Sequence, residues 1–400
     1  MLKRMVSAVL CAAILFAFAA CTRGGSGSND ATAVSLKVWG AQEDQELLKG
    51  MIEEFKKANS NTNYNITLGV VGEKDTQAKF LEDPAAAADV FSFPDDQLLD
   101  LVDAGALYEI TLNKDQIKKD NLAGAYDAAC IGDSLYGYPT TADNGYFLYY
   151  DKNVISSDQA KTLDGILEAC NKAGKRFYMD VSNGWYAASF FLAAGCEVGL
   201  DNNGKQTCNF NNADGVKAGE SIKALCANKA FLTGDDAIFT GGMGDNIAAG
   251  VSGTWNAEAV EDKLGDNYAA TKLPTATIGD KQVQLKSYAG YKIMGVNSGT
   301  KHPKEAMMLA QWLTNEKNQL LRYKERLMGP SNIKAAESRE VKENIALSAL
   351  AEQNEFGVSQ RGIKSTFWLP VEAFGTTMEN KDYSKSMQSL LDSMVKDITT

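Results

Sequence analysis

The pattern of apolar and polar positions predicts strands that alternate with helices. Val34, Leu36 and Val38 alternate with polar residues, which is the period of a half-buried strand. Residues 43–59 then carry apolar side chains at helical spacing, with acids in the first turn. Two further strands and another helix are predicted at 64–71, 89–93 and 95–105. This alternation favours parallel βαβ units.

The later part of the chain continues the pattern and then becomes mostly helical. Strands are predicted at 176–181, 247–253, 268–274 and 292–297, and a hairpin at 197–207. Helices are predicted at 184–195, 212–229, 303–326, 338–353 and 383–398. The fold class expected from these elements is α/β.

Two strand-like stretches, around residues 143 and 288, predict that the chain crosses between two lobes. Sequence after the second crossing would then complete the first α/β series. We expect an N-terminal lobe of residues 34–142 and 288–340, and a C-terminal lobe of residues 143–287 and 341–400. A hinge, a cleft between the lobes and closure about that hinge follow from such an arrangement.

The N-terminus is typical of a secretory signal. Two basic residues precede an apolar run that ends in two alanines and Cys21, the layout of a signal peptide with a lipid-modifiable cysteine. We therefore interpret residues 1–20 as a lipoprotein signal peptide, and the Gly- and Ser-rich residues 21–33 as a flexible tether. The alternative is a plain signal peptide with an incidental cysteine, since Phe18 stands where such motifs usually carry Leu.

Composition and charge narrow the range of partners. The net charge of −11 and the lack of a Lys/Arg cluster argue against binding to nucleic acid or to anionic lipid. No segment after residue 20 reaches membrane-spanning length. We therefore expect an extracytoplasmic protein that touches the bacterial membrane only through a lipid on Cys21.

Five cysteines follow Cys21, and none forms a CxxC motif, which disfavours zinc ribbons and thioredoxin-like redox chemistry. Cys196 and Cys208 flank the predicted hairpin and could lie opposite one another, so a disulfide is predicted there. Cys170 and Cys226, on two predicted helices, could form a second. Because five is odd, either at least one thiol stays free or all are reduced.

Several catalytic chemistries are disfavoured by residue counts. The single histidine, His302, precedes a helix-starting proline and is interpreted as a surface residue, which disfavours Ser/His/Asp and Cys/His catalysis and histidine metal sites. Residues 199–205 have a P-loop-like spacing, but Gln206 replaces the required Ser/Thr. We expect no cofactor and no metal. Carboxylates are plentiful, so composition leaves a glycosidase pair open.

Four of the five tryptophans stand at the ends of predicted elements: Trp39, Trp185, Trp255 and Trp368. Exposed rings at such positions offer a stacking surface for flat, partly apolar ligands, and sugar faces fit that description. The alternative is that each ring closes the end of a lobe. Trp312 lies on an amphipathic stripe and is expected in the core.

Six segments, in order, resemble the family 1 extracellular solute-binding proteins of ABC importers, and among them the maltose/maltodextrin-binding proteins. They are residues 36–57, 88–110, 135–154, 300–316, 326–332 and 365–370. The resemblance extends over nearly all of residues 34–400. It implies a periplasmic-binding-protein fold of two lobes, a monomer, and a protein that binds its ligand without catalysis.

The resemblance also implies a set of ligand-binding residues. Trp185, Trp255 and Trp368 fall where maltodextrin binders place stacking aromatics, and Asp143 where they place a hydroxyl-binding acid. The remaining candidates lie at strand ends: Glu43, Asp44, Asp96, Phe93 and Trp39. Phe93 replaces a Trp of the family, and Gln97 replaces an Arg, so the resemblance leaves the length and identity of the ligand open.

The function expected is that of a lipid-anchored receptor. It would close on a sugar or a short, maltodextrin-like oligosaccharide and present it to the permease subunits of an ABC importer. One alternative is a surface glycoside hydrolase or lyase that uses two acids in the cleft. Another is a binding protein for a polyamine, peptide or phosphate ester, although the acidic balance argues against an anionic ligand.

Overall fold

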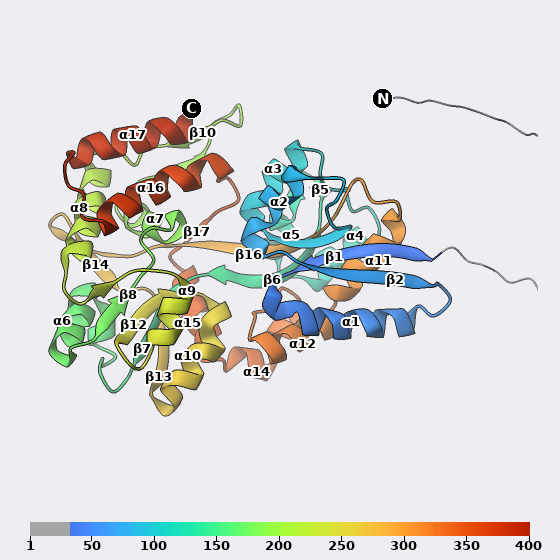
Figure 1. The fold of residues 1–400 in the computed structure, drawn as a ribbon, viewed down its shortest axis with the longest axis horizontal. Coiled ribbons are helices and arrows are strands. Elements are labelled where there is room, and N and C mark those ends of the chain that lie inside the picture. The colour runs from blue at the N-terminus through green and yellow to red at the C-terminus, as the bar shows by residue number, and fades with distance from the viewer. Residues whose placement is uncertain (1–32) are drawn as a thin grey trace, which may run out of the picture. The chain divides into compact units, whose positions relative to one another are not determined.

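The computed structural model describes residues 33–400 (Figure 1). The predicted signal peptide, Cys21 and the tether up to residue 32 lie outside the described residues. Within residues 33–400, no helix is both long and apolar enough to span a membrane.

Two main sheets organise the chain. The first follows the order β17-β16-β3-β1-β2, with β6 paired to β16. Its strands are β1 (Val34–Gly40), β2 (Tyr64–Val70), β3 (Val90–Pro94), β6 (Tyr138–Gly145), β16 (Ser287–Val296) and β17 (Gly357–Ser359). Strand β1 is parallel to β2 and β3, whereas β16 is antiparallel to β3 and β6. The predicted parallel βαβ start is thus confirmed.

The second sheet follows the order β11-β8-β12-β7-β13. Its strands are β7 (Phe147–Asp151), β8 (Arg176–Tyr178), β11 (Phe231–Leu232), β12 (Ile247–Ser252) and β13 (Tyr268–Thr271). The chain also forms three two-stranded sheets: β4 (Cys130–Ile131) with β5 (Ser134–Leu135), β9 (Val198–Leu200) with β10 (Gln206–Cys208), and β14 (Thr275–Ile278) with β15 (Lys281–Gln284).

The helices of the first half are α1 (Gln45–Ala58), α2 (Thr76–Glu82), α3 (Leu98–Asp103), α4 (Lys114–Asp120), α5 (Ala123–Ala128), α6 (Leu163–Ala173) and α7 (Gly184–Ala193). Those of the second half are α8 (Ala213–Ala227), α9 (Asp236–Gly242), α10 (Ala257–Leu264), α11 (Pro303–Leu313), α12 (Glu316–Arg326), α13 (Ile333–Ala336), α14 (Arg339–Lys342), α15 (Ile345–Asn354), α16 (Trp368–Glu379) and α17 (Met387–Thr399). Short 3-10 turns at Gln42–Asp44, Glu73–Asp75, Asp95–Gln97 and Thr254–Asn256 follow strand ends.

Helix α1 shows how the sequence pattern becomes structure. Its residues Leu48, Met51, Ile52 and Phe55 recur at helical spacing, and all four are buried against the first sheet's core. Lys56 and Lys57 lie in the last turn, where positive charge interacts favourably with the helix dipole.

Separate apolar cores surround the two sheets. One core draws its buried residues from 36–138 and 293–313, and two further clusters draw theirs from 146–288 and 346–398. Strand β6 and strand β16, which pair with each other, lead from one core to the other (Figure 1). We propose that residues 34–142 with 288–340, and 143–287 with 341–400, form the two lobes, and this division of cores supports the proposal.

The hairpin at 197–207 is present as β9 and β10, but its register differs from the one expected. Cys208 lies opposite Val198, not Cys196. The turn explains the difference, because the Asp201 carboxylate accepts hydrogen bonds from the backbone of Asn203 (2.8 Å) and Lys205 (2.9 Å) and so sets the loop length. In the structure Cys196 and Cys208 are free thiols, and so are Cys130, Cys170 and Cys226.

Candidate functional site

Two tryptophans predicted to stack on a ligand lie together beside the second sheet. Trp185 opens α7, where the side chain of Asn183 caps the helix by accepting a hydrogen bond from the Trp185 backbone (3.0 Å). Trp255 lies in the turn after β12. The two ring centroids are 6.0 Å apart, and the Trp255 indole N–H donates to the Asp236 carboxylate (3.2 Å). Both rings are partly exposed.

Trp368 opens α16 near the same place. Its ring packs edge-on against Tyr288 (5.7 Å between centroids) and Phe367 (5.0 Å). The starts of α7 and α16 touch: a Cβ added to Gly184 would lie 3.0 Å from the carbonyl oxygen of Trp368, which favours glycine there. The structure therefore brings Trp185, Trp255 and Trp368 to neighbouring element ends.

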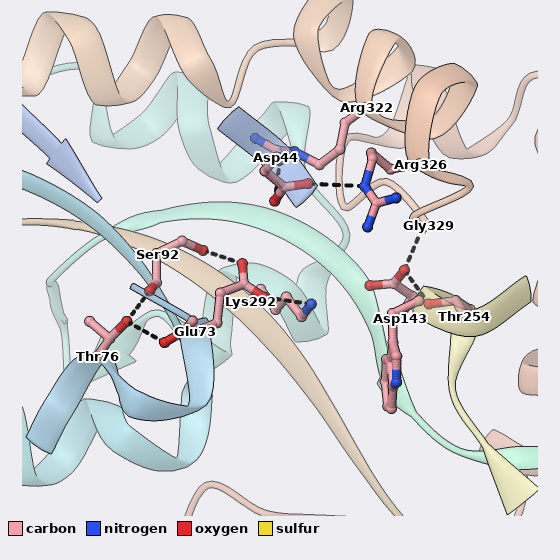
Figure 2. A network of polar contacts seen from close by, with 12 residues as sticks. Asp44, Glu73, Thr76, Ser92, Asp143, Thr254, Lys292, Arg322, Arg326 and Gly329 are labelled. Carbon is pink, nitrogen blue, oxygen red and sulfur yellow. Dashed lines mark hydrogen bonds and ion pairs between the residues drawn. The ribbon is translucent and has the colours of Figure 1, made fainter. Parts of the chain in front are cut away.

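Asp143 lies in β6, the first crossing strand, and is 2% exposed. One carboxylate oxygen, Oδ2, accepts hydrogen bonds from the Thr254 hydroxyl (2.8 Å) and the Gly329 backbone N–H (2.6 Å), as Figure 2 shows. The other, Oδ1, has no hydrogen-bond partner. Asp143 thus joins the crossing strand to the turn that carries Trp255, and retains one unused acceptor.

Asp96 and its neighbour Asp95 form a carboxyl pair after β3. The side-chain amide nitrogen of Gln360, Nε2, donates to Asp95 Oδ1 (2.7 Å) and Asp96 Oδ1 (3.1 Å). Its Oε1 accepts from the Trp185 indole N–H (2.8 Å). Gln360 is 1% exposed. This one amide therefore connects the turn after β3 to a predicted stacking ring.

The environment of this carboxyl pair favours protonation. Burial raises the pKa of Asp95 to about 7, against hydrogen bonds from the Tyr291 backbone and Gln360 that lower it. Desolvation, and then the charge of Asp95, raise the pKa of Asp96 to about 8. Near neutral pH the pair therefore shares protons instead of holding two full charges.

A buried ion pair lies between the first sheet and Trp255. Lys292 Nζ, on β16, is 2.6 Å from Glu73 Oε2, while Glu73 Oε1 accepts from the Ser92 hydroxyl (2.8 Å) (Figure 2). Burial opposes ionisation of both partners, but the Lys292 ammonium lowers the pKa of Glu73 and the Glu73 carboxylate raises the pKa of Lys292. The pair is therefore ionised at neutral pH.

Asp44 is held by two arginines of α12. Its Oδ2 is 3.5 Å from Arg322 Nη1, and its Oδ1 accepts from Arg326 Nε (3.1 Å) (Figure 2). The carboxylate and Arg322 are both nearly fully buried. The predicted hydroxyl acceptor Asp44 is thus engaged in an ion-pair network, whereas its neighbour Glu43 is exposed.

Two predicted ligand residues are placed in the first sheet's core. Phe93 is 0% exposed, because it alternates inward on β3 and packs against Phe91 (5.8 Å between centroids). The structure thus places Phe93 in the core of the first sheet, and its contact with a ligand stays a prediction. Trp39 packs against the same core and approaches Gly69, where an added Cβ would lie 2.9 Å from its ring. It does not join the other three tryptophans.

Sequence reasoning missed three groups of this site. Lys292 had a signal, since a lysine inside an apolar strand needs a buried counter-ion. Glu73 and Gln360 had none, because only the tertiary structure brings them to β16 and to Asp95.

Two hollows of about 320 and 310 Å³ lie elsewhere, and none of the predicted ligand residues lines them.

The fold and these contacts are those of the class of two-lobed receptors. Residues 50–349 match the model of the bacterial extracellular solute-binding proteins, and the chain belongs to that family. Membership places it outside the cytoplasm. The resemblance inferred from the sequence is thereby confirmed.

Individual relatives agree with this assignment. The galactooligosaccharide-binding protein of Bacillus subtilis (strain 168) is 27% identical over 93% of this chain and 91% of its own length. A solved structure of a complex with acarbose matches with a TM-score of 0.85 and 29% identity, covering 92% of this chain and 99% of that one. The maltodextrin-binding protein MalE1 from L. casei BL23, solved without ligand, matches with a TM-score of 0.77 and 25% identity over 92% and 100%. The predicted α/β fold of two lobes is confirmed.

Proposed function

We propose that this protein is the sugar-binding receptor of an ABC importer. It takes up a sugar or short oligosaccharide between its lobes and delivers it to the permease without making or breaking bonds. The observation that carries the proposal is the grouping of Trp185, Trp255 and Trp368 at neighbouring element ends, with Asp143 bonded to the turn that carries Trp255. Rings supply apolar stacking faces, and carboxylates accept hydrogen bonds from hydroxyls.

The charges around the site disfavour an anionic ligand. The network in Figure 2 combines three acids with three bases: Asp44, Glu73, Asp143, Lys292, Arg322 and Arg326. Two further acids lie close by, since Glu258 is 4.0 Å from Arg326 and Asp236 accepts from the Trp255 indole N–H. A neutral sugar therefore suits the site better than a phosphate ester does. The names of the galactooligosaccharide- and maltodextrin-binding relatives point the same way.

Two contacts link the lobes that we propose. The Gly329 backbone N–H donates to Asp143 on the crossing strand, and Gln360 joins Trp185 to Asp95. A ligand that touches both lobes stabilises the closed state in proportion to its differential affinity for that state. The protein would act as a monomer. A lipid on Cys21 would hold it at high effective concentration beside its permease.

Binding and mutagenesis test this function together. A thermal-shift screen over maltodextrins and galactooligosaccharides should reveal a sugar that raises the melting temperature, because it binds only the folded state. Trp255→Ala and Trp368→Ala should each weaken the affinity for that sugar by about 2 kcal/mol, as measured by calorimetry. Trp312→Phe serves as the control, since Trp312 packs on the first sheet's core and its N–H donates to the Met51 carbonyl (3.0 Å).

Two results would contradict the proposal. Unchanged sugar affinity in both Trp255→Ala and Trp368→Ala would rule out stacking. Turnover of the oligosaccharide during incubation would instead favour the hydrolase or lyase alternative, whereas stoichiometric binding without product supports a receptor.

A further inference from the structure

Lys292 is a charged side chain at the centre of the first sheet. It pairs with Pro94 of β3 on one side and Thr141 of β6 on the other, and it is 8% exposed. A lysine is rarely buried to this extent unless its charge is compensated. Glu73 compensates it at 2.6 Å, and the Ser92 hydroxyl holds Glu73 in place.

The ammonium of Lys292 faces Trp255, which follows a strand of the other sheet. Its Nζ lies 6.0 Å from the centroid of the Trp255 ring, at the outer limit of a cation–π contact. Apolar groups pack about 4 Å from a ring, and a hydrogen bond from an ammonium spans about 3 Å. An oxygen on the edge of a sugar ring stacked on Trp255 would thus lie within reach of Nζ.

Donors remain available on this ammonium. A lysine carries three N–H donors and no acceptor. Within residues 33–400, Lys292 makes one ion pair, with Glu73. Asp143 and Asp44 also act on it electrostatically and, with Glu73, keep the ammonium protonated. The side chain is thus charged, oriented by Glu73, and able to donate to a further acceptor.

We infer that Lys292 is a ligand-contacting residue that determines sugar specificity: its ammonium, oriented by Glu73, donates a hydrogen bond to an oxygen of the sugar ring that stacks on Trp255. The inference rests on the proposed sugar-binding function. Because Lys292 only donates, the oxygen that it meets must accept. Sugars that carry a hydroxyl there are selected, whereas a deoxy position or a protonated amino group is rejected.

The test compares three variants with the wild-type chain. The probe is maltotriose or a β-1,4-galactotetraose, whichever the wild type binds in calorimetry. Lys292→Met removes the ammonium but keeps the length of the side chain, and should weaken binding about ten- to hundredfold, the range for a hydrogen bond to a charged group. The control Lys172→Met, at an exposed lysine of α6, should bind within twofold of wild type.

The double variant Glu73→Gln/Lys292→Met separates contact from structure. It leaves no unpaired buried charge, so its melting temperature should recover relative to that of Lys292→Met. Its sugar affinity should stay as low as that of Lys292→Met. Recovery of affinity in the double variant would overturn the inference, because the loss would then come from an unpaired Glu73. Affinity of Lys292→Met within twofold of wild type would also overturn it.

Monodeoxy derivatives of the bound sugar identify the contact directly. One of them should bind about tenfold or more weakly to wild type, yet as well as the parent sugar to Lys292→Met. Equal losses in both proteins for every derivative would refute the contact with Lys292. If the wild type binds no sugar of the panel, the receptor function itself fails, and the inference fails with it.

Discussion

The carboxyl pair after β3 makes the stability of this protein depend on pH. Asp95 is 1% exposed, and burial raises its pKa to about 7 from the ordinary value of 3.8. The folded chain therefore keeps this proton up to about pH 7, whereas the unfolded chain releases it near pH 4. Because the folded state binds more protons between those values, the free energy of unfolding falls as pH rises.

Asp95→Asn removes this dependence and should stabilise the protein above pH 7. An amide oxygen can still accept from the Tyr291 backbone (3.1 Å) and from Gln360 (2.7 Å). A shift of about three pKa units corresponds to about 4 kcal/mol, which is the upper limit of the gain at pH 8. Losing the Asp95 charge also lowers the pKa of Asp96, since that charge is one of the causes that raise it.

Thermal unfolding between pH 5 and pH 9 measures the effect. With about 2.1 cal/mol/K of unfolding entropy per residue, 4 kcal/mol is roughly 5 °C for the folded unit Ala33–Thr400. The melting temperature of wild type should fall across this range more steeply than that of Asp95→Asn. The control is Asp158→Asn, because Asp158 is exposed and its hydrogen bond to Lys161 lowers its pKa. Parallel pH profiles of wild type and Asp95→Asn would refute the reasoning.

Two further predictions concern burial elsewhere in the chain. Arg322→Met should cost about 3 kcal/mol in urea unfolding, because it leaves Asp44 buried with Arg326 alone; a cost below about 1 kcal/mol would contradict a structural role for the network. Burial raises the pKa of Cys208 and of Cys170 to about 12, so iodoacetamide at pH 8 should alkylate both far more slowly in the folded than in the unfolded chain. Mass spectrometry measures the rates, and equal rates in the two states would contradict the raised pKa values of these thiols.

Much of the fold is predictable from local pattern. The alternation at Val34–Val38 and the helical stripe from Leu48 to Phe55 are local periodicities, and both elements form where the pattern indicates. The hairpin before Cys208 is also local, but its register depends on the Asp201 turn. A shift of two residues there leaves Cys196 away from its expected partner.

The residues of the candidate site were likewise predictable from the sequence only in part. Trp185, Trp255 and Trp368 were recognisable because large rings at element ends, in segments that resemble a known family, carry their own signal. Phe93 stands in such a segment too, yet its position on β3 turns it into the core. Sequence position identifies a residue type at a strand end, and only the pleat of the finished sheet decides which face it occupies.

The sequence by itself determined the class of this protein: an exported α/β chain of the solute-binding family, with aromatic rings at the ends of its elements. The tertiary structure alone decided which charges surround those rings. Glu73 meets Lys292, Asp44 meets Arg322, and Gln360 meets Asp95 across separations of 219, 278 and 265 residues. Such pairs produce no local sequence pattern, because a buried charge is compensated by a partner that is close in space, whatever their spacing along the chain.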